Sequence, residues 1–380
     1  MKSHKSTSTW CVNPWLQAHQ KMDGQLNSCC YMQGSFGNNV LEYINSEDLI
    51  KVKEKLLNGE KILNCQQCWD DESHGFESKR LRDNKTYQQR FNLLFHKKDL
   101  LEPNPLLAEY YIRLGNDCNL RCVTCNDNLS TGWLSENKKF NLPYSFRNVI
   151  SSDDPIWNHI EQHSKYAKMI VFIGGEPFMI NIDQQISLLS ALVKDHSAGH
   201  IELRYQTNGT KIPKDLFALW GNFKKVTVWF SIDGIGDSFN YLRYPANWNE
   251  VSNNILEFKN LQETLVNLDL KVTTTLSILN ALEIENVLDW CKIQNLNYFV
   301  NKLNFPAYYN IFNQSPELTN FTKQTLSKSK HDELKIFFTK FPEHVSINYT
   351  TELFERLITL DSRRILSYKD CLALGKIKFD

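Results

Sequence analysis

The stretch 169–206, MIVFIGGEPFMINIDQQISLLSALVKDHSAGHIELRYQ, shows how the middle of the chain folds. It opens with an apolar run at 169–173, continues with a helical pattern at 183–194 and closes with a second strand-like run at 201–206. A strand, a helix and a second strand at this spacing are typical of a parallel β-α-β unit. The sequence therefore predicts an α/β fold for the centre of the chain.

The same alternation extends from 169–206 in both directions. Further strand-like runs lie at 110–114, 226–232, 270–276 and 298–303, and further helical patterns lie at 154–166, 213–220, 248–265 and 283–294. Six strands of this kind form either a partial barrel or an open, doubly wound sheet, and the pattern alone leaves both open. We place this α/β region at 106–305.

The first part of the chain, 1–105, is irregular in pattern and carries five of the ten cysteines. Its one clear helical pattern lies at 46–58. Ser46 suits the N-cap of that helix, and Gly59 suits its C-terminal stop. We expect this part to be a separate cysteine-rich module.

The last part of the chain, 306–380, is predicted to be a helical extension. Helical patterns lie at 319–338 and 350–366, and no group of reactive side chains accompanies them. The expected order is therefore a cysteine-rich module, an α/β core and a helical C-terminal extension.

Composition limits the possible partners. The 380 residues include 43 Lys and Arg and 43 Asp and Glu, so the formal net charge is zero. A neutral protein has no bulk charge with which to hold duplex DNA or an anionic membrane. No apolar run reaches the roughly 20 residues that span a membrane, and the start of the chain lacks the apolar stretch of a secretion signal. We expect a cytoplasmic protein that binds neither nucleic acid nor membrane.

Three cysteines follow the first predicted strand of the core, with the spacing Cys118-x3-Cys122-x2-Cys125. In a reducing compartment, clustered cysteines bind metal more often than they form disulfides. Thiolates select zinc or iron–sulfur clusters, and a structural site needs four protein ligands. Three local thiolates leave one iron of a four-iron cluster open, which indicates a catalytic site. The alternative is a zinc site completed by a distant His or Cys.

The segment Gly174-Gly175-Glu176-Pro177 follows the strand at 169–173. Glycines let the backbone approach a ligand closely, and the Glu176 carboxylate can accept hydrogen bonds from an ammonium group. In isolation this segment equally fits an ordinary tight turn.

Polar residues also follow the later strands of the core. Ser231 and Asp233 lie at the end of the strand at 226–232, and Arg243 lies twelve positions beyond Ser231. A hydroxyl and a guanidinium suit the recognition of a ribose and a carboxylate. Asp233 equally fits a turn, and the segment 207–209, which ends the strand at 201–206, fits an ordinary turn as well as a ligand contact.

Four cysteines of the first part, Cys11, Cys29, Cys65 and Cys68, come from three dispersed segments. Four such thiolates can close one tetrahedral zinc site or one four-iron cluster, and both possibilities stay open. Cys30 lies next to Cys29, so the second ligand is ambiguous. Of the remaining cysteines, Cys291 lies on an apolar helical pattern and is expected in the core, and Cys371 is unassigned.

The order of motifs over 106–305 resembles the radical SAM superfamily. The segment 118–125 resembles the family's cysteine signature, the Gly-Gly-Glu-Pro loop resembles the loop that binds the amino group of S-adenosylmethionine (SAM), and 231–243 resembles a segment whose serine and arginine contact SAM. The resemblance implies a [4Fe–4S] cluster on the triplet that cleaves SAM to a 5′-deoxyadenosyl radical. Thr124 stands where the family often has an aromatic residue.

The N-terminal cysteines resemble the twitch module, the short form of the SPASM auxiliary module. Cys11 precedes a Pro-Trp pair, Cys29 ends a glycine-containing hairpin, and Cys65 and Cys68 form a Cys-x2-Cys pair. The resemblance implies a second, auxiliary [4Fe–4S] cluster bound through Cys29, with Cys30 as a small buried residue. It also implies a partial (β/α)6 barrel, although the module here precedes the barrel instead of following it.

The resemblance implies an enzyme that modifies a peptide or protein side chain and takes electrons from a donor such as flavodoxin or ferredoxin. The alternatives are radical modification of a small molecule (a sugar, a nucleotide or a cofactor precursor) and a non-catalytic zinc or iron–sulfur protein. Four aromatic residues could line a peptide groove or simply pack on the barrel rim, namely Trp133, Tyr241, Tyr244 and Trp248.

Overall fold

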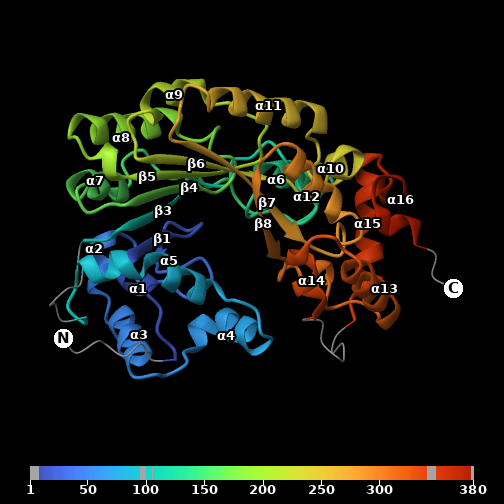
Figure 1. Ribbon diagram of the computed structural model, residues 1–380, viewed down its shortest axis with the longest axis horizontal. Coiled ribbons are helices and arrows are strands. Elements are labelled where there is room, and N and C mark those ends of the chain that lie inside the picture. The colour runs from blue at the N-terminus through green and yellow to red at the C-terminus, as the bar shows by residue number, and fades with distance from the viewer. Residues whose placement is uncertain (1–7, 95–99, 105, 340–347, 378–380) are drawn as a thin grey trace. The chain divides into compact units, whose positions relative to one another are not determined.

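The computed structural model describes residues 8–94, 100–104, 106–339 and 348–377. Eight strands form a mostly parallel sheet in the order β2-β1-β3-β4-β5-β6-β7-β8 (Figure 1). The α/β class predicted from the sequence is therefore confirmed. The expectation about a secretion signal concerns the start of the chain, of which the first seven residues lie outside the described part.

All six strands predicted for the core are present. They are β3 (Glu109–Arg113), β4 (Met169–Ile173), β5 (Glu202–Thr207), β6 (Lys225–Ser231), β7 (Leu268–Leu276) and β8 (Asn297–Lys302). Parallel pairing is explicit between β3 and β4, between β4 and β5, and between β7 and β8. The first four residues of β4 are buried, as expected for a strand of a parallel sheet covered on both faces.

The N-terminal part is more regular than its sequence predicted. Two short strands, β1 (Gln17–Gln20) and β2 (Leu26–Asn27), extend the sheet, with β1 parallel to β3 and β2 antiparallel to β1. The predicted helix is α3 (Glu47–Leu57), and the Ser46 hydroxyl accepts the Leu49 N–H as an N-cap. The other helices of this part are α1 (Asn13–Leu16), α2 (Val40–Asn45), α4 (Gln66–Ser73) and α5 (Lys79–Leu94).

One compact unit comprises 1–116, 148–205 and 214–226. Within it, one face of the sheet is covered by α1 to α5, and the other is covered by three helices that follow strands of the core (Figure 1). These are α7 (Pro155–Gln162), α8 (Ile182–Lys194) and α9 (Lys214–Trp220). Gln17 and His19 of β1 and Glu109 of β3 are buried polar residues of this unit.

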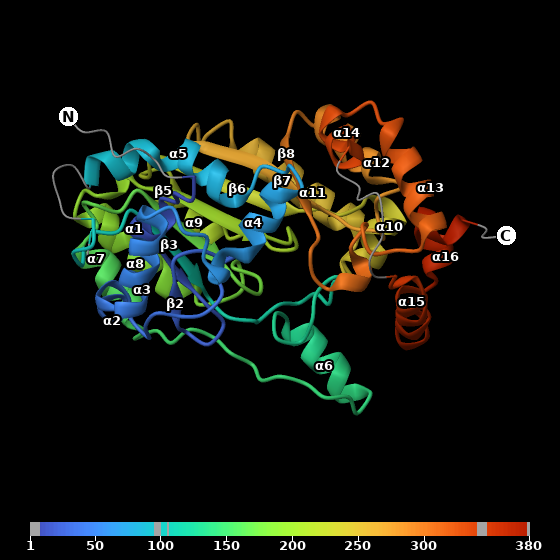
Figure 2. The same cartoon turned by 90° about the horizontal axis from the view of Figure 1, so that it is seen from below.

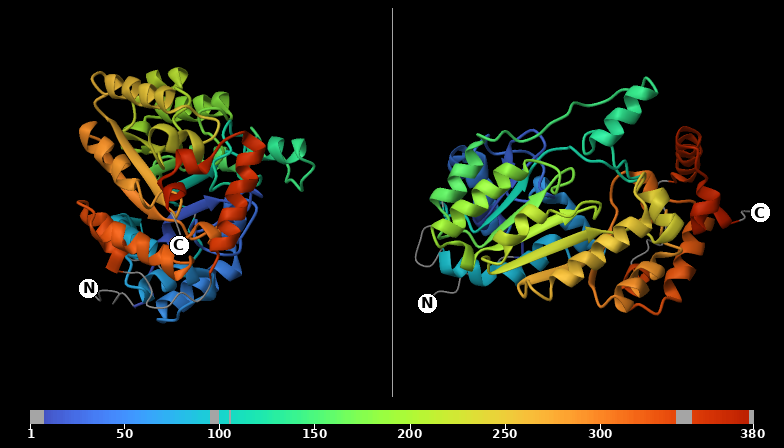
Figure 3. Two further views of the ribbon diagram at one scale, coloured as in Figure 1. Left: turned by 90° about the vertical axis from the view of Figure 1, so that its right-hand side faces the viewer. Right: turned by 90° about the horizontal axis from the view of Figure 1, so that it is seen from above.

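The second compact unit comprises 117–147, 206–213 and 227–380. It contains β7 and β8 side by side (Figure 2), and its last four helices form the C-terminal part of the chain (Figure 3). Its helices are α6 (Thr131–Lys139), α10 (Gly236–Leu242), α11 (Trp248–Leu261), α12 (Ile284–Ile293), α13 (Pro316–Ser327), α14 (Asp332–Thr339), α15 (Thr350–Arg364) and α16 (Tyr368–Cys371). Helices α6 and α10 were not predicted.

The helix predicted at 319–338 is two helices, α13 and α14. The chain leaves the helical path after α13 because Ser329 and Lys330 bind the Glu285 carboxylate, through the hydroxyl at 2.5 Å and the backbone N–H at 2.9 Å. These local hydrogen bonds compete with helix continuation. Among the described residues, no helix is both long and apolar enough to cross a membrane.

Candidate active site

The loop that carries the cysteine triplet is fixed by backbone hydrogen bonds to a second loop. The Arg121 N–H donates to the Tyr244 carbonyl at 2.7 Å, and the Val123 N–H donates to the Leu242 carbonyl at 2.9 Å. Between these two carbonyls in sequence lies Arg243. The ladder therefore holds Arg243 beside the cysteines, although more than one hundred residues separate them in sequence.

Helix α6, which follows the triplet in sequence, contacts two of its cysteines. The Thr131 hydroxyl accepts the Cys118 N–H at 3.1 Å, and the indole N–H of Trp133 donates to the Cys122 carbonyl at 2.9 Å. Trp133 is buried. The Cys125 N–H closes a turn onto the Cys122 carbonyl at 3.0 Å. The backbone of all three cysteines is thus held in place by side chains or by local structure.

Two polar side chains reach the sulfur atoms of the triplet. Asn208 Nδ2 lies 3.7 Å from Cys118 Sγ, and Arg243 Nη1 lies 3.7 Å from Cys122 Sγ. Burial raises the pKa of Cys122, while the Arg243 charge opposes that rise, and burial raises the pKa of Cys125 to about 12. Asn208 also accepts the Thr210 N–H at 2.9 Å, so it is both a turn residue and a neighbour of the cysteines.

Arg243 forms a buried ion pair with Asp233. The Arg243 Nη2 to Asp233 Oδ2 distance is 2.6 Å, and the side chains are 13% and 7% exposed. Asp233 Oδ1 also accepts the Thr275 N–H at 2.8 Å, so this carboxylate is more than a turn former. Arg243 Nε is buried and has no hydrogen-bond partner among the described residues. Nearby in sequence, the Ser231 hydroxyl accepts from Gln206 at 3.0 Å.

The Gly-Gly-Glu-Pro loop has a conformation that its glycines require. Gly174 and Gly175 have φ angles of 89° and 51°, in the left-handed region that favours glycine. A Cβ atom on Gly174 would lie 2.7 Å from both Arg113 Cγ and the Gly115 carbonyl. Glu176 is fully buried and accepts the Phe178 N–H at 3.1 Å. This loop, which includes Pro177, belongs to the first compact unit, whereas the triplet belongs to the second.

The four predicted auxiliary cysteines line one cavity. It encloses about 370 Å³ of empty space, part of which is open to solvent. Its lining includes Cys11, Cys29, Cys65, Cys68, Met32, Leu56 and Arg80. Cys30 is exposed and is not part of this lining, so the expectation that it is a small buried residue is wrong.

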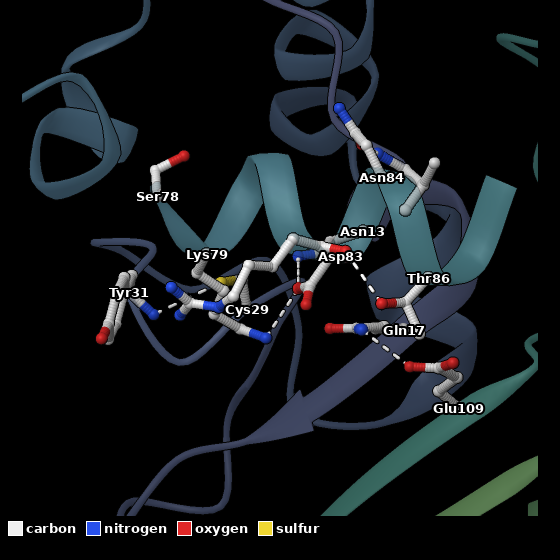
Figure 4. Close-up of polar contacts among 12 residues, drawn as sticks. Asn13, Gln17, Cys29, Tyr31, Ser78, Lys79, Asp83, Asn84, Thr86 and Glu109 are labelled. Carbon is white, nitrogen blue, oxygen red and sulfur yellow. Dashed lines mark hydrogen bonds and ion pairs between the residues drawn. The ribbon is translucent and has the colours of Figure 1, made fainter. Parts of the chain in front are cut away.

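The N-terminal end of α5 lies beside Cys29 (Figure 4). Lys79 Nζ pairs with Asp83 at 2.6 Å, and Asp83 also accepts from Asn13 Nδ2 at 2.7 Å. The hydrogen bond with Cys29 and the charge of Lys79 lower the pKa of Cys30 to about 7. Lys79 was not predicted as a site residue, because a lysine on a polar helix has no distinguishing pattern.

The donor sets fit the expected groups in kind. Soft thiolates suit iron–sulfur clusters and zinc, and the cysteines of each set lie within one compact unit. Among the described residues, no group of three or more His, Cys, Asp or Glu side chains is placed to hold a single metal ion. Cys291 is fully buried on α12, so its prediction as a core residue is confirmed. Cys371 is half-buried.

Two of the four aromatic residues are packing residues. Trp133 and Tyr241 are buried, and the Tyr241 hydroxyl donates to Asp361 at 2.8 Å. Tyr244 stacks against the guanidinium of Arg121, and Trp248 contacts other aromatic rings. Ordinary packing therefore explains Trp133 and Tyr241.

No family model and no curated protein matches the chain. The solved structures that it resembles include anSMEcpe with bound AdoMet, at 15% identity and a TM-score of 0.43, covering 69% of this chain and 64% of that chain. Streptococcus suis SuiB bound to S-adenosylmethionine has 15% identity, a TM-score of 0.40 and coverage of 75% and 60%. The FeFe-hydrogenase maturase HydG from Carboxydothermus hydrogenoformans has 12% identity, a TM-score of 0.35 and coverage of 87% and 86%.

Two of these neighbours, anSMEcpe and SuiB, were solved with S-adenosylmethionine (AdoMet) bound. SuiB has also been solved with its precursor peptide SuiA, and anSMEcpe with the peptide Cp18Cys. The chain spans 64% and 60% of the lengths of the first two solved structures that it matches.

Proposed function

We propose that this chain is a radical SAM enzyme whose active [4Fe–4S] cluster is bound by Cys118, Cys122 and Cys125. The observation that carries the proposal is the ladder between the triplet loop and the loop of Arg243. It places a guanidinium with a buried, unpartnered Nε beside Cys122. When bound, the cluster and SAM supply a 5′-deoxyadenosyl radical that abstracts a hydrogen atom.

The protein's own residues bind and orient SAM in this proposal. Arg243 donates from its free Nε to the SAM carboxylate, and Asp233 orients the guanidinium through its ion pair with Nη2. The Ser231 hydroxyl faces the ribose. The backbone of Gly174 and Gly175 admits the ligand closely, and Glu176 accepts from the SAM ammonium group.

We also propose a second [4Fe–4S] cluster in a twitch-like module at 1–105. The convergence of Cys11, Cys29, Cys65 and Cys68 on one cavity supports it. Zinc is the alternative occupant. The proposed architecture is completed by a partial (β/α)6 barrel at 106–305 and a helical extension at 306–380.

The proposed substrate is a peptide or protein side chain, and the proposed electron donor is a protein such as flavodoxin or ferredoxin. The support is the resemblance of the serine–arginine segment and of the cysteine module to those of peptide-modifying enzymes. Radical modification of a small molecule is the alternative. Size-separated extract fractions, with and without protease treatment, test the substrate. Stimulation of 5′-deoxyadenosine formation by the small-molecule fraction alone would contradict a peptide substrate.

The test of the central proposal uses protein purified and reconstituted without oxygen. Replacing all three cysteines of the triplet by Ala should remove about four irons, one cluster, and abolish 5′-deoxyadenosine formation from SAM. Cys371→Ala is the matched control, because Cys371 is half-buried like the triplet but lies on α16. Unchanged SAM cleavage in the triple variant would show that the active centre is elsewhere.

A further inference from the structure

A second cavity lies at the carboxyl ends of β1 and β3, within the first compact unit. It encloses about 420 Å³ of empty space, part of it open to solvent, and its lining includes Lys21, Arg113, Asn148, Ser151 and Asp154. The carboxyl ends of parallel strands are where α/β folds bind ligands.

One wall of this cavity is formed by a segment that returns to the end of β3. Gly115 pairs with Val149 in an isolated bridge, and the Ile150 N–H donates to the Leu114 carbonyl at 2.9 Å. Gly115 has a φ of 143°, and a Cβ there would lie 2.3 Å from the Asn148 carbonyl. Only glycine permits this approach, so the wall is a built feature of the fold.

Arg113 lies in this cavity without a carboxylate partner. Its stem packs against Gly174, and its guanidinium donates one long hydrogen bond, 3.6 Å, to the Met22 sulfur. A thioether is a weak acceptor. Among the described residues, no ion pair involves Arg113. Burial lowers the pKa of Arg113, and a negative charge on Cys30 opposes that shift.

The other charged groups of the cavity are already engaged. Lys21 lies 3.6 Å from Asp23 and donates to the Ser35 hydroxyl at 2.7 Å. Asp154 caps α7 by accepting the Ile156 N–H at 3.0 Å, and it accepts from Gln20 at 3.2 Å. A partly desolvated cation without a counter-charge is costly to the fold, so a ligand that supplies the charge explains its retention.

We propose that Arg113 binds a carboxylate of the substrate in this cavity. The guanidinium offers two parallel N–H donors that match the geometry of a carboxylate. Because the stem of Arg113 packs on Gly174, the bound carboxylate lies next to the loop to which SAM binding is assigned. The identification of the ligand as the substrate rests on the proposed function, whereas the carboxylate site itself does not.

The test measures binding without SAM or reductant, by ligand-observed NMR on the anaerobically prepared full chain. The probes are N-acetylglutamate, its neutral analogue N-acetylglutamine, and inorganic phosphate. N-acetylglutamate should bind, and Arg113→Gln should weaken its binding about tenfold or more. Arg113→Lys, which keeps the charge but loses the fork, should retain part of the binding. Lys85→Gln, on the exposed face of α5, should change nothing.

Melting temperature separates a binding role from a structural one. Removing an unpaired, partly buried charge should leave the melting temperature of Arg113→Gln unchanged or raise it, whereas loss of a structural contact lowers it. Equal binding of N-acetylglutamate by Arg113→Gln and by the unaltered protein overturns the inference. No N-acetylglutamate binding, or preferential binding of phosphate, overturns it as well. If the probe binds through Arg113 but the unaltered protein does not cleave SAM, the proposed function fails and the carboxylate site stands.

Discussion

Arg243→Gln should destabilise the second compact unit strongly as well as weaken SAM binding. The substitution removes the guanidinium 2.6 Å from Asp233 and leaves a carboxylate with a 7% exposed side chain without its cation. Breaking a buried pair in this way costs about 3–5 kcal/mol, because the remaining charge is not solvated. At roughly 2–4 °C per kcal/mol for a domain of this size, the melting temperature should fall by roughly 6–20 °C.

A surface pair in the same unit provides the control. Arg147 pairs with Asp117, but its side chain is 67% exposed, so Arg147→Gln should cost less than about 1 kcal/mol. Asp233→Asn combined with Arg243→Gln should be more stable than Arg243→Gln alone, since no unpaired charge remains. The assay is thermal unfolding of the three variants and the unaltered protein. If Arg243→Gln melts together with Arg147→Gln, the buried pair does not contribute as argued.

Three further outcomes are expected. Cys29→Ala should empty the auxiliary site and Cys30→Ala should not, because Cys29 lines the cavity and Cys30 does not. Iron analysis of both variants tests this, and iron loss from Cys30→Ala alone would reverse the assignment. Glu176→Gln should weaken SAM binding, measured by equilibrium binding, and an unaltered dissociation constant would remove Glu176 from the site. Burial raises the pKa of Glu109 to about 7, against the effect of Arg90, so the folded state binds more protons than the unfolded state between pH of about 4.5 and 7. Stability should fall as pH rises through that window, and melting curves of Glu109→Gln should show a smaller fall.

The core strands were predictable because their sequences are apolar runs. β4 matches its predicted bounds, and the other five agree within two residues at either end. β1 was not predictable, since its sequence, QAHQ, has neither an apolar run nor β-branched residues. It is a strand because it pairs with β3, and its four residues are buried by the helices around it. Only tertiary contacts determine such a strand.

Helix α5 likewise could not be predicted from the pattern of its sequence. Its buried positions are Arg80, Asp83, Tyr87 and Phe91, which have helical spacing but include two charged residues. A hydrophobic stripe is therefore missing from the sequence although the helix is well packed. Arg80 is buried because it pairs with Glu72 at 2.6 Å, a partner that precedes the helix and is not recognisable from periodicity.

The residues of the candidate site also differ in how far their positions could be predicted from the sequence. The cysteines and the Gly-Gly-Glu-Pro loop were found because their spacing is local. Asn208 was recognised only as a turn or a ligand contact, and its approach to Cys118 depends on two loops 90 residues apart. The exposure of Cys30 also contradicted its expected burial, because adjacent residues can face opposite directions while the sequence gives no sign of which faces the cavity.

Strand β3 carries two charged side chains on the same face, Glu109, which is paired within the fold, and Arg113, to which we assign ligand binding. Side chains alternate along a strand, so Glu109 and Arg113 point to the same side. Glu109 is fully buried and pairs with Arg90 at 2.6 Å and with Gln17 at 2.7 Å. Arg113 lies two residues beyond Tyr111, and among the described residues its side chain donates only to the Met22 sulfur. The fold supplies Glu109 with a cation and an amide donor. Among the described residues, Arg113 at the end of the strand forms no ion pair, so a ligand that reaches this end of the sheet can supply the counter-charge.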